Sequence, residues 1–152
     1  MKAPAELERL PEKQRHEFHR RFTAQFHAWL DAGGGACWLR QPKHAQIVAD
    51  TLRFFDGERY LLDHFVIMPN HVHILVTPAP KHDISAIERS WKTFTARKIN
   101  GLLGRKGSFW QAETYDHIVR SEEQLAHYRR YIAENPIKAK LHDEEYLLGA
   151  PT

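Results

Sequence analysis

The sequence predicts an α+β fold, and three observations indicate it. Apolar residues recur at helical spacing in several segments. β-branched and aromatic residues concentrate in the stretch 60–77, and glycines and prolines separate these segments from one another. The expected order along the chain is helix, helix, strand, strand, helix, strand, helix, which is typical of an α+β domain.

The N-terminal part of the chain is expected to be helical. Four aromatic residues at spacings of four, four and three predict a helix over 12–31, which three glycines at 33–35 would end. These aromatics are Phe18, Phe22, Phe26 and Trp29. A second helix is expected over 42–55, beginning at Pro42.

The stretch YLLDHFVIMPNHVHILVT predicts an antiparallel hairpin with strands near 59–68 and 71–77, interrupted by Pro69-Asn70. A third helix is expected to begin at a cap, Asp83 or Ser85, and to run to about Leu103. Its buried stripe is expected to consist of Ile84, Ile87, Trp91 and Phe94.

The C-terminal part predicts a short strand over 114–119 and a last helix. A capping-box pattern beginning at Ser121 opens this helix, and Asn135-Pro136 is expected to stop it after about Glu134. Along it, Leu125, Tyr128 and Ile132 are spaced as a core stripe.

Composition fits one soluble domain over 1–152. Hydrophobic residues make up 42% and charged residues 27% of the 152 residues. No apolar run approaches the roughly 20 residues that span a bilayer, and no secretory signal is apparent, so we expect a cytoplasmic protein without a membrane partner. The single Cys37 excludes an intrachain disulfide, and a net charge of +3 permits a polyanionic partner without requiring one.

Two residue patterns could carry chemistry. His71 and His73 are one step apart on a predicted strand, so both side chains project from the same face and could bind one divalent ion. Tyr131 and Asn135 share one face of the last predicted helix, and Tyr131 lies at the flank of the core stripe, where it could face a cleft. Taken alone, these patterns are better explained by ordinary strand histidines and a structural tyrosine.

Four blocks in the span from about Arg59 to Leu141 change this reading: VIMPNHVHILV, SWKTFTARKIN, FWQAETYDHIVRS and YIAENPIKAKL. In this order they resemble the single-tyrosine transposases with a His-hydrophobic-His (HUH) motif, the IS200-like transposases, and most closely the REP-associated tyrosine transposases. The resemblance implies a ferredoxin-like antiparallel sheet flanked by helices. Because helices are expected at the N-terminus, we expect the core of the domain to span about 36–141 and residues 1–35 to form an N-terminal helical extension.

The resemblance also implies an activity: cleavage and rejoining of single-stranded or hairpin DNA at REP-like sites through a covalent 5′-phosphotyrosine. It implies that His71 and His73 bind Mg²⁺ or Mn²⁺, that Asn135 is a third ligand, and that Tyr131 is the nucleophile. Tyr115 lies on a predicted strand without a helical partner four residues on, so we expect it to be structural or to contact DNA.

DNA contacts are expected mainly from basic residues of the third helix, the loop after it, and the last helix. Phe109 and Trp110 follow a glycine-rich loop and are expected to be open, so that Trp110 could stack on bases. The expected set is Arg89, Lys92, Arg97, Lys98, Arg105, Lys106, Trp110, Arg130 and Lys138. For each basic residue a solvated helix face is the alternative.

The chain departs from the family pattern in two places. Relatives carry an initial strand with an aromatic-histidine-hydrophobic pattern beside the histidine strand; helices are predicted in its place here, and only 36–39 could substitute for it. Lys140 stands where a glycine is usual.

Two rival functions stay open. The first is a module that binds single-stranded nucleic acid without cutting it, and the second is a metal hydrolase that uses an activated water. The sequence does not distinguish a monomer from a homodimer.

Overall fold

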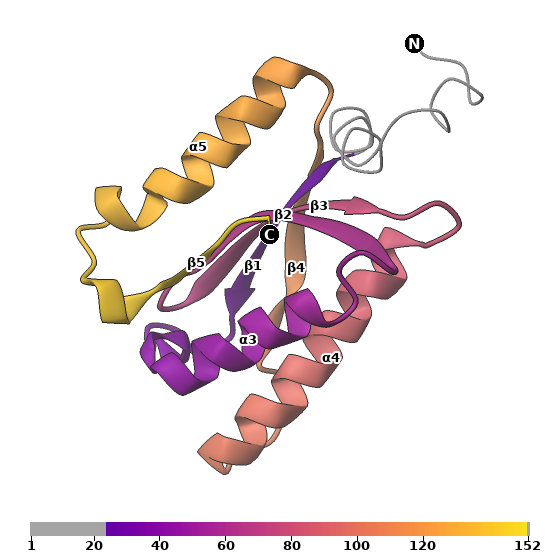
Figure 1. Cartoon of the computed structure of the whole chain (residues 1–152). Coiled ribbons are helices and arrows are strands. Elements are labelled where there is room, and N and C mark those ends of the chain that lie inside the picture. Colours follow the sequence, from indigo (N-terminus) through magenta and orange to yellow (C-terminus); the bar gives the residue numbers. More distant parts are fainter. Residues whose placement is uncertain (1–23, 152) are drawn as a thin grey trace.

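The computed structural model describes residues 24–151, which form one antiparallel sheet with helices on both faces (Figure 1). The sheet contains five strands in the order β4-β1-β3-β2-β5. The strands are β1 (Gln25–Asp31), β2 (Tyr60–Ile67), β3 (His71–Pro78), β4 (Trp110–Ile118) and β5 (Leu147–Gly149). The helices are α3 (Pro42–Phe54), α4 (Ile84–Leu103) and α5 (Glu122–Lys138), with short 3₁₀ helices at Trp38–Arg40 and Asp143–Glu145.

The expected ferredoxin-like arrangement is confirmed. The segment from β1 to β4 runs strand, helix, strand, strand, helix, strand, and its four strands lie in the order β4-β1-β3-β2. Helices α3 and α4 cover one face of this sheet, and α5 covers the other (Figure 1). The short strand β5, which the sequence did not predict, pairs with the outer edge of β2.

The helix predicted over 12–31 is wrong for its C-terminal part, because residues 25–31 form the strand β1. Phe26 and Trp29 therefore lie on opposite faces of the sheet, and each is buried under a different helical layer. A strand buried on both faces lacks the polar alternation that identifies a strand in a sequence. Phe18 and Phe22 lie outside the described residues.

This strand also resolves the first departure from the family pattern. β1 pairs with the histidine strand β3, and its residues Phe26, His27 and Ala28 match the aromatic-histidine-hydrophobic pattern that the sequence analysis did not find. Residues 36–39 do not substitute for this strand, because 36–37 lie in a loop and 38–39 begin a 3₁₀ helix.

The remaining elements follow the predictions closely. The second helix, the hairpin and the third helix are confirmed, and the Asp83 carboxylate caps α4 by accepting from the Ser85 amide. Ser121 caps α5, although the Gln124 side chain accepts from the Arg120 amide rather than closing a reciprocal box. Contrary to prediction, α5 continues through Pro136 to Lys138. A proline lacks one N–H, so the helix loses a single backbone hydrogen bond at Pro136, and it ends two residues later.

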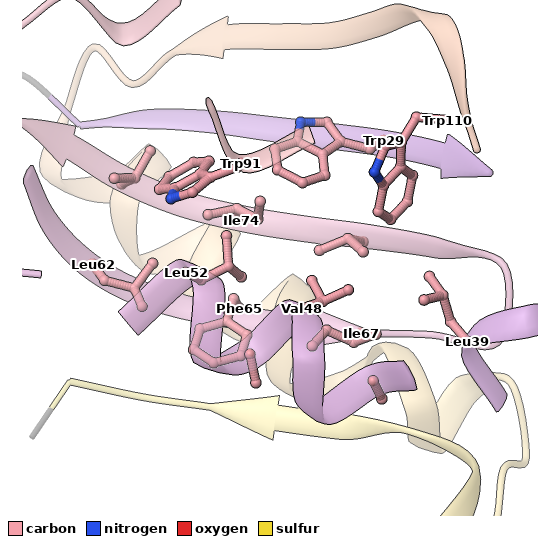
Figure 2. Close-up of a cluster of buried hydrophobic side chains, with 14 of the residues drawn as sticks. Trp29, Leu39, Val48, Leu52, Leu62, Phe65, Ile67, Ile74, Trp91 and Trp110 are labelled. Atoms are coloured by element: carbon pink, nitrogen blue, oxygen red, sulfur yellow. The ribbon is translucent and has the colours of Figure 1, made fainter. Parts of the chain in front are cut away.

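Two layers of buried side chains position everything else. The larger core lies between the sheet and α3 and α4 and includes three tryptophans, Trp29, Trp91 and Trp110 (Figure 2). The smaller core lies under α5 and includes Phe26, Leu125 and Ile132. Among residues 24–151, no helix is long and apolar enough to cross a membrane.

Candidate active site

The two motif histidines stand on β3, an interior strand between β1 and β2. Strand alternation directs Val72 and Ile74 into the larger core, so His71 and His73 face the α5 side. The two imidazole rings are 4.8 Å apart between centroids. His73 is 8% exposed and stacks on Phe26, whereas His71, closer to the Pro69-Asn70 turn, is half-buried.

The surroundings keep both imidazoles neutral. Burial lowers the pKa of His71, and burial together with the charge of His71 lowers the pKa of His73 to about 4. Neutral imidazole is the form that binds a metal ion.

Hydrogen bonding at the pair also suits ligation. The Nδ1 atom of His71 lies 2.7 Å from the Asn70 side-chain oxygen, a contact that fixes the ring and leaves Nε2 for another partner. The Nδ1 atom of His73 is buried without a hydrogen-bond partner among the described residues. A ring nitrogen without a partner beside an oriented imidazole fits a divalent ion.

Tyr131 lies above the histidine pair on α5. Its ring centroid is 5.3 Å from that of His73 and 6.0 Å from that of Phe26, and the side chain is 38% exposed. The neighbouring Ile132 is fully buried, so the expectation that Tyr131 stands at the flank of the core stripe is confirmed.

An ion pair fixes α5 against the sheet next to this tyrosine. Arg129 donates two hydrogen bonds to Asp63, of 3.0 Å from Nε and 2.8 Å from Nη2. Asp63 is 1% exposed and sits where the register of β2 shifts between Leu62 and Phe65. Because of that shift, Leu62 and Phe65 both face the larger core although they are three residues apart, and Asp63 between them faces α5.

Two adjoining cavities open on this face of the sheet. One, of about 340 Å³, is lined by residues that include His73, Tyr131, Tyr115 and His127. The other, of about 460 Å³, is lined by residues that include both motif histidines, Tyr115 and Glu113. His73 and Tyr115 border both, so the two cavities form one candidate cleft.

The structure thus brings Tyr115 into the cleft as well. It is 58% exposed and lies 6.2 Å from Phe26 between ring centroids. Its place on a strand made it a weaker nucleophile candidate in the sequence, but the cleft is lined by three phenols, those of Tyr115, Tyr128 and Tyr131. Tyr128 is half-buried, so the exposed Tyr115 and Tyr131 are the two that an experiment must distinguish.

Asn135 is half-buried one helical turn after Tyr131 and is not among the residues that line either cavity. Sequence reasoning missed Glu113 and His127. Glu113 stands two residues before Tyr115 on β4, and His127 stands four residues before Tyr131 on α5, so the periods of strand and helix were the available signals.

The expected DNA-contacting residues lie on two faces. Arg130 and Lys138 are exposed on α5, on the side of the cleft. The basic residues of α4 lie across the sheet from it (Figure 1). Exposed in that region are Arg89, Arg97, Lys98 and Lys106.

Besides Lys138, which pairs with Glu134 at 3.6 Å on the surface of α5, three of the expected residues are engaged within the protein. Lys92 donates to the Thr114 hydroxyl, and Arg105 donates to the Asn100 side chain and covers the Trp38 ring at 4.2 Å. The expectation that Phe109 and Trp110 are open is wrong, because they are 1% and 6% exposed. Trp110 packs beside Trp29 and donates to the Thr95 hydroxyl, so it offers no surface to bases (Figure 2). Phe94, expected in the core, is 48% exposed.

Comparison with known proteins identifies the family. Residues 45–135, more than half of the chain, match the family described as IS200-like transposases. The chain belongs to this family.

This transposase chain matches its curated relatives over only part of their length. It is 29% identical over 82 residues to a Haemophilus influenzae protein provisionally named a REP-associated tyrosine transposase, covering 47% of each chain. A second protein of that organism is 31% identical over 101 residues, which are 50% of this chain and 54% of the relative. The chain therefore spans about half the length of the curated relatives it matches.

A solved structure, a REP-associated tyrosine transposase bound to a REP hairpin, has the same fold. The TM-score is 0.63 at 21% identity, over 78% of this chain and 69% of that one. The resemblance seen in the sequence is thus confirmed at the level of family and fold.

A second group on the opposite face of the sheet is also compatible with a divalent metal ion. It consists of His27 on β1, Glu88 on α4 and Asp116 on β4. The Nδ1 atom of His27 lies 2.7 Å from the Glu88 carboxylate and 2.6 Å from that of Asp116. Burial alone would raise the pKa of Glu88, but the hydrogen bond and charge of His27 outweigh it and lower that pKa.

Proposed function

We propose that this chain is a metal-dependent single-strand DNA endonuclease and transposase. In this proposal it cleaves and rejoins single-stranded DNA at hairpin, REP-like sites through a covalent 5′-phosphotyrosine at Tyr131. His71, His73 and Asn135 would hold Mg²⁺ or Mn²⁺. A neighbour of the same fold carries a REP hairpin, which favours hairpin DNA as the partner.

One observation carries the proposal. An exposed phenol on α5 and a buried imidazole on β3 are 58 positions apart in the chain (131 − 73 = 58), yet their rings are 5.3 Å apart beside one cavity. A tyrosine nucleophile next to a metal-binding histidine is the arrangement that this chemistry needs.

When bound, the divalent ion would polarise the scissile phosphate and stabilise the charge that develops on it. The protein's residues supply the rest. The Asn70 contact orients the His71 ring, the Asp63–Arg129 ion pair keeps α5 on the sheet, and this helix holds the Tyr131 hydroxyl over the cleft.

The bonding changes balance as a transesterification. The Tyr131 oxygen forms a bond to phosphorus, the bond from phosphorus to the 3′ oxygen breaks, the phenol loses its proton and the departing 3′ oxygen gains one. Because one phosphodiester replaces another, the same residues can catalyse the reverse, joining step. Phenols have a pKa near 10, so a neighbouring cation must assist the loss of the proton at neutral pH.

DNA would approach from the α5 side in this proposal. Arg130 and Lys138 are exposed there and could bind backbone phosphates near the cleft. The exposed basic residues of α4 lie on the opposite face, where they would contact a second part of a hairpin or a flanking strand.

The test is an adduct assay on end-labelled hairpin oligonucleotides with Mn²⁺, resolved on denaturing gels. We expect an adduct in the wild type and in Tyr115→Phe, and none in Tyr131→Phe. Loss in Tyr115→Phe alone would move the nucleophile to β4. If the DNA were cleaved without any adduct, and Tyr131→Phe did not affect this cleavage, the protein would be a metal hydrolase. Hairpin binding without cleavage would indicate the non-catalytic module.

A further inference from the structure

We propose that Glu113, on the edge strand β4, supplies a carboxylate ligand to the divalent ion held by His71 and His73. This inference rests on the proposed function and adds to its site a residue from a strand outside the sequence motifs.

The sheet register places Glu113 in line with the first histidine. His71 pairs with Leu30 on β1, and the register of β4 against β1 shifts from Trp29↔Thr114 to Asp31↔Trp110. Residues 111–113 therefore form an irregular stretch of β4 opposite Leu30. Two strand spacings, together about 9.6 Å, separate this stretch from His71.

The side chains on β4 alternate in the direction that the proposal needs. Thr114 accepts from Lys92 on the α4 side of the sheet, and Tyr115 lines the cleft on the α5 side. Glu113 is thus directed into the cleft, and it lines the same cavity of about 460 Å³ as His71 and His73. Among the described residues only the His27 group has three imidazole or carboxylate ligand atoms within 4.8 Å of one another, so the Glu113 side chain has to turn towards His71 when an ion binds.

The chemistry of the ligand set favours a carboxylate here. The three ligands expected from the sequence, two imidazoles and an amide, carry no charge, whereas Mg²⁺ and Mn²⁺ favour carboxylate oxygens. Asn135 does not line this cavity, and Glu113 does. Within residues 24–151, Glu113 makes no hydrogen bond or ion pair, so its carboxylate is available to a cation.

Electrostatics also favour Glu113 as a ligand of the ion. An uncompensated carboxylate in the cleft would repel the phosphate of the DNA, and a divalent ion between them would convert that repulsion into a bridge. The His27 group on the other face differs, because its two carboxylates already share the Nδ1 atom of His27 and lie near Lys92.

Titration of the protein with Mn²⁺ alone, followed by calorimetry and by the electron paramagnetic resonance signal of free Mn²⁺, tests the inference. Four proteins are compared: wild type, Glu113→Gln, Glu134→Gln, and a double variant with both motif histidines replaced by alanine. Glu134 is the matched control, an exposed glutamate on α5 that pairs only with Lys138 among the described residues, at 3.6 Å. Thermal unfolding of each variant establishes that it is folded.

We expect Glu113→Gln to weaken Mn²⁺ binding on the order of tenfold or more and Glu134→Gln to leave it within twofold. Glu113→Gln should have no further effect in the double variant, where only binding at the His27 group would persist. Unchanged affinity in Glu113→Gln, or an equal loss in Glu134→Gln, would overturn the inference. Failure of the proposed function is distinguishable: wild type would then form no phosphotyrosine adduct, whatever its affinity for Mn²⁺.

Discussion

The ion pair between Arg129 and Asp63 leads to a prediction about the stability of the nucleophile helix. Replacing Arg129 by methionine keeps an unbranched side chain and removes the guanidinium that donates two hydrogen bonds to a carboxylate only 1% exposed. The change leaves Asp63 buried, with the His64 ring at 2.7 Å among its partners.

The magnitude follows from the burial of the two partners. Removing one partner of a fully buried ion pair costs roughly 3–5 kcal/mol. The Arg129 side chain is 29% exposed, and His64 still donates to the carboxylate, so both effects reduce the cost. We therefore expect Arg129→Met to lower the free energy of unfolding at pH 7 by about 2–3 kcal/mol.

The pH dependence gives a second, independent signature. Burial would raise the pKa of Asp63, but hydrogen bonds from His64 and Arg129 and the charge of Arg129 outweigh it and hold that pKa well below its usual range. A group with a depressed folded-state pKa stabilises the protein above its unfolded pKa of about 3.9, and this stability is lost as the pH falls below about 5. In Arg129→Met the folded pKa rises, so this part of the pH dependence should shrink.

Urea unfolding followed by circular dichroism at pH 7 and at pH 3 measures both effects. Arg130→Met is the matched control, because Arg130 is the adjacent arginine and is exposed; we expect a change within about 0.5 kcal/mol. If Arg129→Met were no more destabilising than this control, or if its stability fell with pH as steeply as that of the wild type, the ion pair would not anchor α5.

Three further substitutions test the backbone. A Cβ at Gly149 would overlap the buried Phe65 ring, so Gly149→Ala should lower the free energy of unfolding by at least about 1–3 kcal/mol. Gly101 lies in the last turn of α4 with open space around its Cα, so Gly101→Ala should instead raise the free energy of unfolding, by up to about 1 kcal/mol. Equal effects in thermal or urea unfolding would contradict the close approach of β5 to β2. Lys140 has φ 57°, a left-handed conformation that favours glycine, so Lys140→Gly should raise the free energy of unfolding by about 0.5–1 kcal/mol, and a decrease would show that the lysine side chain stabilises this turn.

Local patterns were sufficient for much of the fold. The hairpin around Pro69-Asn70 was readable because two β-rich runs flank a turn, and α4 was readable because its apolar spacing and its Asp83 cap agree. The same alternation rule placed both motif histidines on one face of a strand. These features depend only on residues near one another in the chain.

Where prediction failed, long-range packing had overridden local preference. The aromatic spacing that ends at Phe26 and Trp29 is helical in period, yet two separate cores bury these residues from opposite sides of β1. Trp110 follows a loop that looks open in the sequence, but it closes the larger core beside Trp29.

The sequence by itself determined the family, the α+β class and the placement of both motif histidines on one face of a strand, while the choice of Tyr131 as nucleophile stays a prediction. Only the tertiary structure decided which side chains share the cleft. Tyr115, Glu113 and His127 reach it from β4 and α5, and no spacing along the chain relates β4 to the histidine strand. The order and register of the strands bring these side chains together. Burial on both faces of the sheet sets that order and register, and it depends on the whole chain rather than on any local segment.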